Sequence, residues 1–239
     1  MTETAPKSTL PYPPVHYGKQ FVVLSDWYDY FIICFCPRMP TLCRYLTLPC
    51  TDMTDNLGYG KEKRRDGNLD ILSGKTTFRD EFRRMLDSVS ANGHTLDECK
   101  EVLKQNIKLD PGFRDFYRYC KSKDIPVVIV SSGMEPIIRS VLSALVTPEE
   151  AAEIDIISND VDVHLDGTWS IKYRHPTSGY GHDKSQAILP YRALPKPPTL
   201  FFFGDGVSGA YIRILRTSFL AEHFTRPPIK HPLSYLRNL

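Results

Sequence analysis

The chain has no long apolar run and little net charge, and each absence excludes a class of protein. No segment of its 239 residues approaches the roughly 18 consecutive apolar residues that cross a bilayer, so we expect no membrane partner. The formal net charge is only +2, which argues against electrostatic capture of nucleic acid. The proline-rich start lacks the charged and apolar segments of a secretory signal. We therefore expect residues 1–18 to be a disordered leader of a cytoplasmic protein.

The cysteines also lack a regular pattern. Six are present, and those crowded together between residues 34 and 50 are Cys34, Cys36, Cys43 and Cys50. This is not the paired spacing of common zinc modules, and a disulfide framework would require secretion. A cysteine knuckle that binds zinc and a partner protein is one alternative interpretation of this stretch. Nothing in the sequence indicates an oligomeric state.

What the sequence does contain is an alternation of strand-like and helix-like segments. Three runs rich in β-branched and aromatic residues each end at a polar motif. The runs are 20–25, 125–130 and 199–203, and the motifs that follow them are Asp26, Ser131-Ser132-Gly133 and Gly204-Asp205-Gly206. Parallel strands bring their carboxyl ends to one edge of a sheet, so these motifs are expected to meet in one crevice. The fold class predicted is α/β, with a Rossmann-like three-layer core around a parallel sheet.

Between the first two runs, the composition becomes helical and charged. Residues 76–85 have helical spacing, Thr95 precedes an acidic first turn, and Asp110-Pro111 is a helix start. We interpret 52–119 as a helical lobe inserted into the sheet domain. Beyond it we expect further helices and strands, listed here by range: a helix over 135–145, a strand over 154–157, a hairpin that turns at 166–167, and a helix over 183–189 with Asp183 as its N-cap.

The residues at the strand ends suit a magnesium ion and a phosphate group. Asp26 can act as a nucleophile and a metal ligand, and Asp205 can supply a second hard oxygen. The hydroxyl of Ser131 and the backbone N–H groups of Ser132-Gly133 can hold phosphoryl oxygens near a helix N-terminus. Lys184 can balance the charge of the phosphate and of Asp26. Each element alone is weakly specific, and the order and spacing of the set carry the prediction.

Three stretches resemble the haloacid dehalogenase superfamily of phosphatases: VVIVSSGM (127–134), GHDKSQAI (181–188) and FFFGDGVS (201–208). The stretch MTDNLGYGKEKRRDGN (53–68) is similar to the entry of this family's helical cap, and its position resembles the phosphoserine phosphatase-like branch.

The resemblance implies Mg²⁺-dependent hydrolysis of a small phosphorylated metabolite through an aspartyl-phosphate on Asp26. It assigns phosphate binding to Ser131, charge balance to Lys184 and a metal ligand to Asp205. It divides the chain into a core, residues 19–51 and 120–239, and a cap, residues 52–119.

The chain departs from the family pattern at two places. The family has a second Asp two residues after the nucleophile, followed by Gly-Thr, whereas this chain has Tyr28, Asp29 and Tyr30. An acid is common four residues after Asp205, where this chain has Gly209. General acid–base help accounts for about 10² to 10⁴ in rate, so we expect impaired turnover.

Both departures fall in segments of unusual composition, 27–51 and 209–239. One hypothesis is that these segments are foreign to the family sequence, through a retained intron or a misplaced splice junction. The alternative is a diverged loop and tail. A message that encodes the chain unchanged would reject the first hypothesis.

Two other functions are compatible with parts of the sequence. The loss of the second Asp would suit a catalytically inactive relative that binds phosphate or metal. Residues 204–209 match G-x-G-x-x-G after a strand, the dinucleotide fingerprint, but the proline-broken tail leaves little chain to complete a β-α-β unit.

Overall fold

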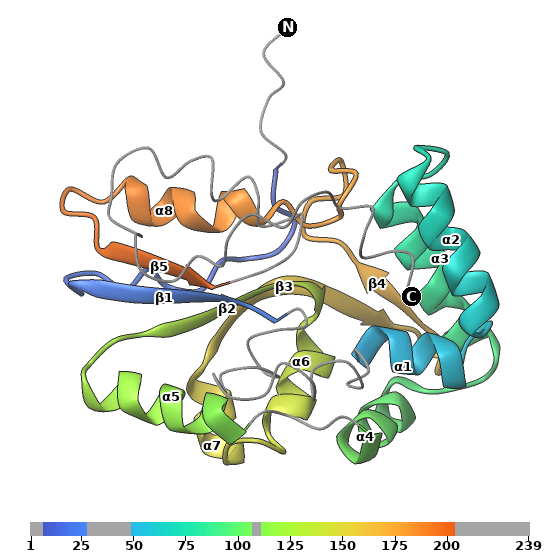
Figure 1. Cartoon of the computed structure of the whole chain (residues 1–239), viewed down its shortest axis with the longest axis horizontal. Coiled ribbons are helices and arrows are strands. Elements are labelled where there is room, and N and C mark those ends of the chain that lie inside the picture. The colour runs from blue at the N-terminus through green and yellow to red at the C-terminus, as the bar shows by residue number, and fades with distance from the viewer. Residues whose placement is uncertain (1–6, 28–48, 107–110, 204–239) are drawn as a thin grey trace, which may run out of the picture.

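The computed structural model describes residues 7–27, 49–106 and 111–203, and centres on a five-stranded sheet of order β4-β3-β2-β1-β5 (Figure 1). Its strands are β1 (Phe21–Asp26), β2 (Val127–Met134), β3 (Asp155–Val163), β4 (Trp169–Lys172) and β5 (Thr199–Phe203). β1 lies between β2 and β5, parallel to both, and β2 is also parallel to β3. β4 is antiparallel to β3. The predicted α/β class with a mainly parallel sheet is confirmed.

Apolar residues cover both faces of the central strands, as a parallel sheet with helices on each side requires. Val22 and Leu24 of β1 belong to one buried cluster, and Val23 between them belongs to another. Successive side chains of a strand point to opposite faces, so the two clusters are the two sides of the sheet. The sheet is therefore the middle layer of three.

Helices form the outer layers. The 3₁₀ helix η2 (Lys184–Ile188) and α8 (Leu189–Arg192) cover one face, through Ala187, Ile188 and Tyr191. The opposite face is covered by α5 (Pro111–Ser122), α6 (Glu135–Leu142) and α7 (Pro148–Glu153). Among the described residues, no helix combines the length and hydropathy that crossing a bilayer requires.

Four helices follow β1 and precede α5 in the part of the chain that the structure describes. They are α1 (Pro49–Asn56), α2 (Lys61–Leu72), α3 (Phe78–Ala91) and α4 (Leu96–Asn106). α1 contacts all three of the others, while α3 also packs on β4 and α4 on α6. Thr77 caps α3 by accepting from the Asp80 N–H, and Thr95 and Glu98 cap α4 reciprocally. The helical character predicted for this region is confirmed, and the division into cap and core stays a prediction.

Several predicted boundaries were wrong by a few residues. The second strand continues past Val130 to Met134, and the helix after it ends at Leu142. The helix expected over 183–189 is a 3₁₀ turn capped by Asp183 and followed by α8, because Pro190 suits the first turn of a new helix. The hairpin at Asp166-Gly167 is present, and Gly167 adopts φ +83° in it.

The prediction of a disordered leader was wrong for residues 7–18. Arg174 is buried, and its guanidinium donates to Ser8 Oγ and to the carbonyls of Leu10 and Pro11. Its charge also lies 4.8 Å from the centre of the Tyr12 ring. A buried guanidinium needs acceptors, and the N-terminal segment supplies them. Composition alone could not reveal this, because the partner lies far along the sequence.

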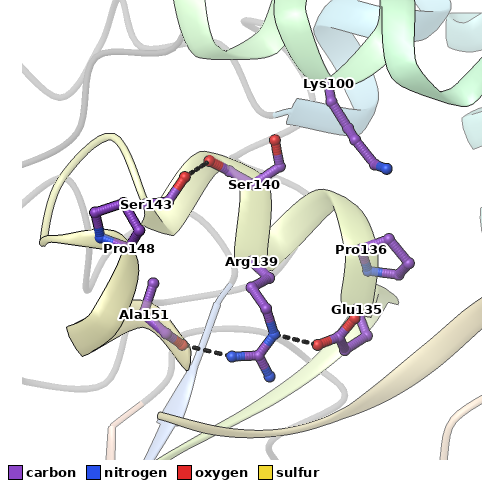
Figure 2. A pocket seen from close by; sticks show the side chains of 8 residues that line it. All are labelled: Lys100, Glu135, Pro136, Arg139, Ser140, Ser143, Pro148 and Ala151. Atoms are coloured by element: carbon purple, nitrogen blue, oxygen red, sulfur yellow. Dashed lines mark hydrogen bonds and ion pairs between the residues drawn. The ribbon is translucent and has the colours of Figure 1, made fainter. Parts of the chain in front are cut away.

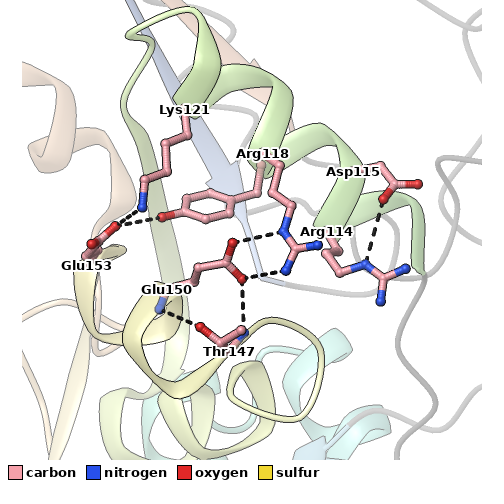
Figure 3. A network of polar contacts seen from close by, with 8 residues as sticks. Arg114, Asp115, Arg118, Lys121, Thr147, Glu150 and Glu153 are labelled. Carbon is pink, nitrogen blue, oxygen red and sulfur yellow. Dashed lines mark hydrogen bonds and ion pairs between the residues drawn. The ribbon is translucent and has the colours of Figure 1, made fainter.

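An ion-pair network joins α5 to α7 (Figure 3). Arg118 donates from Nε and Nη2 to the two carboxylate oxygens of Glu150, at 2.9 and 3.1 Å, and Lys121 pairs with Glu153. Glu150 also accepts from the Thr147 N–H in a capping box. The Arg118 side chain, followed by the Thr147 backbone, lowers the pKa of Glu150 to about 2.

We expect this network to make stability depend on pH. The pKa of Glu150 is about 2 in the folded chain and 4.5 in the unfolded chain, so its ionised carboxylate stabilises the fold fully above pH 4.5. This stabilisation is lost as the pH falls toward 2. Glu150→Gln should lower the free energy of unfolding by about 0.5–1 kcal/mol at pH 7, and by less at pH 3. Urea unfolding at both pH values, with Glu62→Gln on the exposed face of α2 as control, measures the difference. An equal loss at pH 7 and pH 3 would contradict the assignment.

The close approach of α2 to α3 depends on Gly67. A Cβ at this position would lie 1.9 Å from Oε1 of the buried Glu81. Glu81 cannot easily yield, because it accepts from Tyr59 Oη at 2.8 Å and pairs with Arg84. Alanine within a helix normally stabilises a protein by about 0.5–1 kcal/mol relative to glycine. At position 67 the contact with Glu81 opposes this gain, so we expect alanine to destabilise the chain.

Gly67→Ala should therefore lower the free energy of unfolding by about 1–3 kcal/mol, because of overpacking against Glu81. Chemical denaturation followed by circular dichroism measures it, with Asp66→Ala at the exposed neighbouring position as control. A Gly67→Ala variant as stable as the control would show that Glu81 moves aside without cost.

Candidate active site

A buried ion pair lies at the carboxyl end of the central strand. Asp26 ends β1, Lys184 begins η2, and Nζ of Lys184 lies 2.6 Å from Oδ2 of Asp26. Each residue is only 1% exposed. A charge is costly to bury unless it is paired, so neither residue is a chance surface contact. The structure brings together these two predicted residues, which are 158 positions apart.

The motif Ser131-Ser132-Gly133 lies beside this pair. Asp26 is paired in the sheet with Val130, so Ser131 is the next residue along the neighbouring strand. Between the pairs Val130–Ile157 and Met134–Asn159, the strand β2 advances further than β3, which makes the motif a bulge. The motif was predicted to follow the strand that ends at Val130, and this is corrected to a bulge within β2. α6 begins directly after Met134.

Within the bulge, the Ser131 hydroxyl is already oriented. The Gly133 N–H donates to Ser131 Oγ at 3.0 Å. This bond occupies a lone pair of the oxygen and leaves the hydroxyl hydrogen to donate elsewhere. Such a donor suits a phosphoryl oxygen, which can only accept.

Two histidines that were not among the predicted site residues lie at the turn before Lys184. His182 is fully buried, its Nδ1 lies 2.6 Å from the Ser131 carbonyl, and burial lowers its pKa to about 3. His175 stacks on it with ring centroids 5.4 Å apart, and burial lowers the pKa of His175 too. Both rings are neutral at pH 7. Histidines are common in polar loops, so the residue type alone did not identify His182 as part of the site. The feature that could have identified it is its position two residues before Lys184.

The bulge has a second support in Asn159. Its side-chain Nδ2 donates to the Ser132 carbonyl at 2.8 Å, and its Oδ1 accepts from the Arg174 N–H at 2.9 Å. Asn159 has no exposed surface. The sequence offered no signal for this residue beyond its place shortly after the strand predicted over 154–157.

Other predicted site residues lie outside the described residues. These are Asp205 with its flanking Gly204 and Gly206, and the departures Tyr28, Asp29, Tyr30 and Gly209. The parallel pair Ser25–Phe203 shows that the last described residue of β5 lies alongside the end of β1. The cysteines Cys34, Cys36 and Cys43 also lie outside the described residues.

Magnesium fits the chemistry of the described part of the site. The carboxylate of Asp26 has two oxygens, so it can pair with Lys184 and still ligate a hard cation. No cluster of three or more His, Cys, Asp or Glu side chains suited to a metal occurs among the described residues. A complete shell therefore needs a further ligand, which the sequence assigns to Asp205.

A pocket of about 470 Å³ lies elsewhere, between α4, α6 and α7 (Figure 2). Its cationic side chains are already engaged: Arg139 pairs with Glu135 and donates to the Ala151 carbonyl, and Lys100 pairs with Asp97. None of the predicted site residues lines it. The pocket is therefore a poor candidate for a phosphate site.

Removing one partner of the buried pair should destabilise the chain strongly. In EDTA, Lys184→Met should lower the free energy of unfolding by about 3–5 kcal/mol, because it removes the buried cation that contacts the Asp26 carboxylate. The double variant Asp26→Leu/Lys184→Met should recover part of that loss. Chemical denaturation measures all three proteins, with Lys100→Met at a surface ion pair as control. A loss no greater than the control's would contradict the buried pair.

Comparison with known proteins places the chain among hydrolases. The profile of the haloacid dehalogenase-like hydrolase family matches residues 46–208. Pdp3-interacting factor 1 of Schizosaccharomyces pombe is 50% identical over 158 residues, which cover 65% of this chain and 67% of that protein. The polyol phosphate phosphatase PYP1 of Saccharomyces cerevisiae is 41% identical over 165 residues, which cover 65% and 66%. The alignments thus span about two thirds of each relative.

Solved structures share the fold. A hydrolase of the same family from Salmonella enterica serovar Typhi superimposes with a TM-score of 0.57 at 18% identity, over 80% of this chain and 58% of that chain. A phosphoserine phosphatase with an analogue of its phospho-aspartyl intermediate gives a TM-score of 0.52 at 15% identity, over 81% of both chains. At these identities, the likeness concerns the fold alone.

Proposed function

This chain belongs to the haloacid dehalogenase-like hydrolase family, and together with the relative that is 41% identical this supports a phosphatase; we propose that Asp26 carries out the hydrolysis of a phosphomonoester through an aspartyl-phosphate. The observation that supports this most is the buried contact between Asp26 and Lys184. A carboxylate held at the end of the central strand, with a fixed ammonium beside it, has the position and the charge that a nucleophile toward phosphate needs.

The proposed reaction has two steps. A carboxylate oxygen of Asp26 attacks phosphorus, the bond from phosphorus to the ester oxygen breaks, and the leaving alkoxide takes up a proton from solvent. Water then attacks phosphorus and gives up a proton to solvent, the bond to the Asp26 oxygen breaks, and inorganic phosphate and the free carboxylate form. Ser131 donates its hydroxyl hydrogen to a phosphoryl oxygen, and Lys184 compensates the charge.

Mg²⁺ is part of the proposal, with Asp26 and Asp205 as its ligands. When bound, it supplies positive charge that offsets the repulsion between the carboxylate and the phosphate. The N–H groups of Ser132 and Gly133 add donors at the strand end.

The first substrates to test are small polyol phosphates. This class comes from the relative that is 41% identical and is a polyol phosphate phosphatase. We propose residues 52–119 as the cap that selects the organic group, since α1–α4 lie between the first two strands of the core. A cytoplasmic setting is also proposed, and the buried free thiols Cys99 and Cys120 are compatible with it.

The position of Tyr28 predicts slow turnover and favours a second candidate, a relative that binds phosphate without hydrolysing it. A tyrosine is a weak acid, so an alkoxide would leave without efficient protonation. The family match covers residues 46–208, so 209–239 and the larger part of 27–51 lie outside it, as the hypothesis of a faulty gene product predicts, while residues 46–51 lie within it.

The test compares two substrates whose leaving groups differ. In Mg²⁺, the chain should hydrolyse p-nitrophenyl phosphate at a low but measurable rate, because p-nitrophenolate can leave without being protonated. Glycerol phosphate should be hydrolysed more slowly still, because its alkoxide needs a proton in order to leave. Asp26→Asn should abolish both activities. Tyr28→Asp/Asp29→Gly/Tyr30→Thr, which restores Asp-x-Asp-Gly-Thr from Asp26, should raise glycerol phosphate hydrolysis by about 10²–10⁴.

Equal activity of the chain and of Asp26→Asn would refute catalysis by Asp26. If no variant is active and phosphate still binds, the non-catalytic relative is the correct reading. Tyr30→Thr alone serves as the matched control, since it changes the same segment without adding an acid.

A further inference from the structure

The bulge formed by Ser131, Ser132 and Gly133 cannot be held by the sheet ladder alone. The regular pairing of β2 with β3 is interrupted between Val130 and Met134, so the backbone groups there need other partners. Two buried side chains supply them. His182 lies 2.6 Å from the Ser131 carbonyl, and Asn159 donates to the Ser132 carbonyl at 2.8 Å.

The hydrogen bonds define the tautomer of each ring. A carbonyl oxygen can only accept, so Nδ1 of His182 carries the hydrogen and donates to Ser131. In His175 the arrangement is reversed, because Nδ1 accepts from the Asp183 N–H at 3.0 Å and Nε2 is left to donate to Tyr12 Oη. The two neutral rings therefore carry their hydrogens on different nitrogens, because Nδ1 faces a carbonyl in His182 and an N–H group in His175.

The contact of His182 with the Ser131 carbonyl is a hydrogen bond, and it is the interaction that requires a hydrogen-bond donor at this position. Its Nε2 is buried and has no hydrogen-bond partner among the described residues. A half-satisfied imidazole costs free energy to bury, so an apolar side chain would fill the same volume more favourably. The donation to Ser131 is what a histidine adds at this position.

One short segment thereby connects the two groups that would hold phosphate. His182 reaches Ser131, and Lys184, two residues later, reaches Asp26. The turn that precedes His182 is closely packed. Gly181 has φ +70°, and a Cβ at this position would lie 2.3 Å from the Tyr173 ring. The ring of His175 stacks on His182 from the same turn.

We propose that His182 is a positioning residue, which holds the Ser131 bulge at a fixed separation from the Lys184 ammonium so that hydroxyl and ammonium bind one phosphoryl group together. This inference rests on the proposed function, because it takes Ser131 as a phosphate donor. It assigns to His182 a role in binding rather than in proton transfer.

The test measures the affinity for inorganic phosphate in Mg²⁺ by isothermal titration calorimetry. His182→Leu and Ser131→Ala should each weaken binding by about tenfold, the effect of one net hydrogen bond. His182→Asn should stay within about threefold of the unchanged chain, because its amide nitrogen can take the place of Nδ1. His164→Leu, at an exposed histidine of the β3–β4 hairpin, should change nothing.

Two results would overturn the inference alone: binding by His182→Leu equal to that of the unchanged chain, or His182→Asn as weak as His182→Leu. If the unchanged chain does not bind phosphate, the proposed function fails and this inference fails with it. Unimpaired binding by Ser131→Ala would likewise remove the phosphate role of Ser131.

Should His182→Leu not fold, the ring tautomer in the unchanged chain decides. Long-range ¹H–¹⁵N correlation spectra of the labelled protein distinguish the two neutral forms. The expected result is hydrogen on Nδ1 of His182, with and without phosphate. Hydrogen on Nε2 would contradict donation to Ser131 and overturn the inference.

Discussion

The buried ion pair between Asp26 and Lys184 is the constraint on which the rest of the site depends. Two opposite charges with 1% exposure are held in contact, since separating them in the interior would lose their attraction while both stay out of water. This requirement fixes the end of β1 against the start of η2. It also explains why η2 lies over the sheet at this point, although the segment is short and irregular.

Around that pair, the structure replaces ladder hydrogen bonds by side-chain hydrogen bonds. The bulge interrupts the backbone pairing of β2 with β3, and His182 and Asn159 donate to the carbonyls of Ser131 and Ser132 instead. Asn159 is in turn held by Arg174, whose guanidinium binds the N-terminal segment. A continuous set of buried and part-buried polar contacts thus joins residues near the start of the chain to the candidate site, and each contact depends on its neighbours staying in place.

The sequence was sufficient for the parts of the fold that depend on local patterns. The apolar runs before Asp26 and Ser131 predicted the central strands, and the Thr95 cap predicted the start of α4. The segment 7–18 was misjudged, because its order comes from Arg174, a residue more than 150 positions away. His182 and Asn159 were missed for the same reason: their roles are defined by carbonyls of the bulge, and a bulge has no sequence pattern of its own. Asp205 and Tyr28 lie outside the described residues, so their predicted roles stay predictions.

Binding of beryllofluoride, which mimics a phosphoryl group on aspartate, tests the central claim most directly because it needs no leaving group and no general acid. In ¹⁹F NMR spectra, the chain should show Mg²⁺-dependent resonances of bound beryllofluoride, and Asp26→Asn should show none. Resonances of equal intensity in both proteins, or none in the unchanged chain at saturating Mg²⁺, would contradict the assignment of Asp26 as the residue that accepts the phosphoryl group.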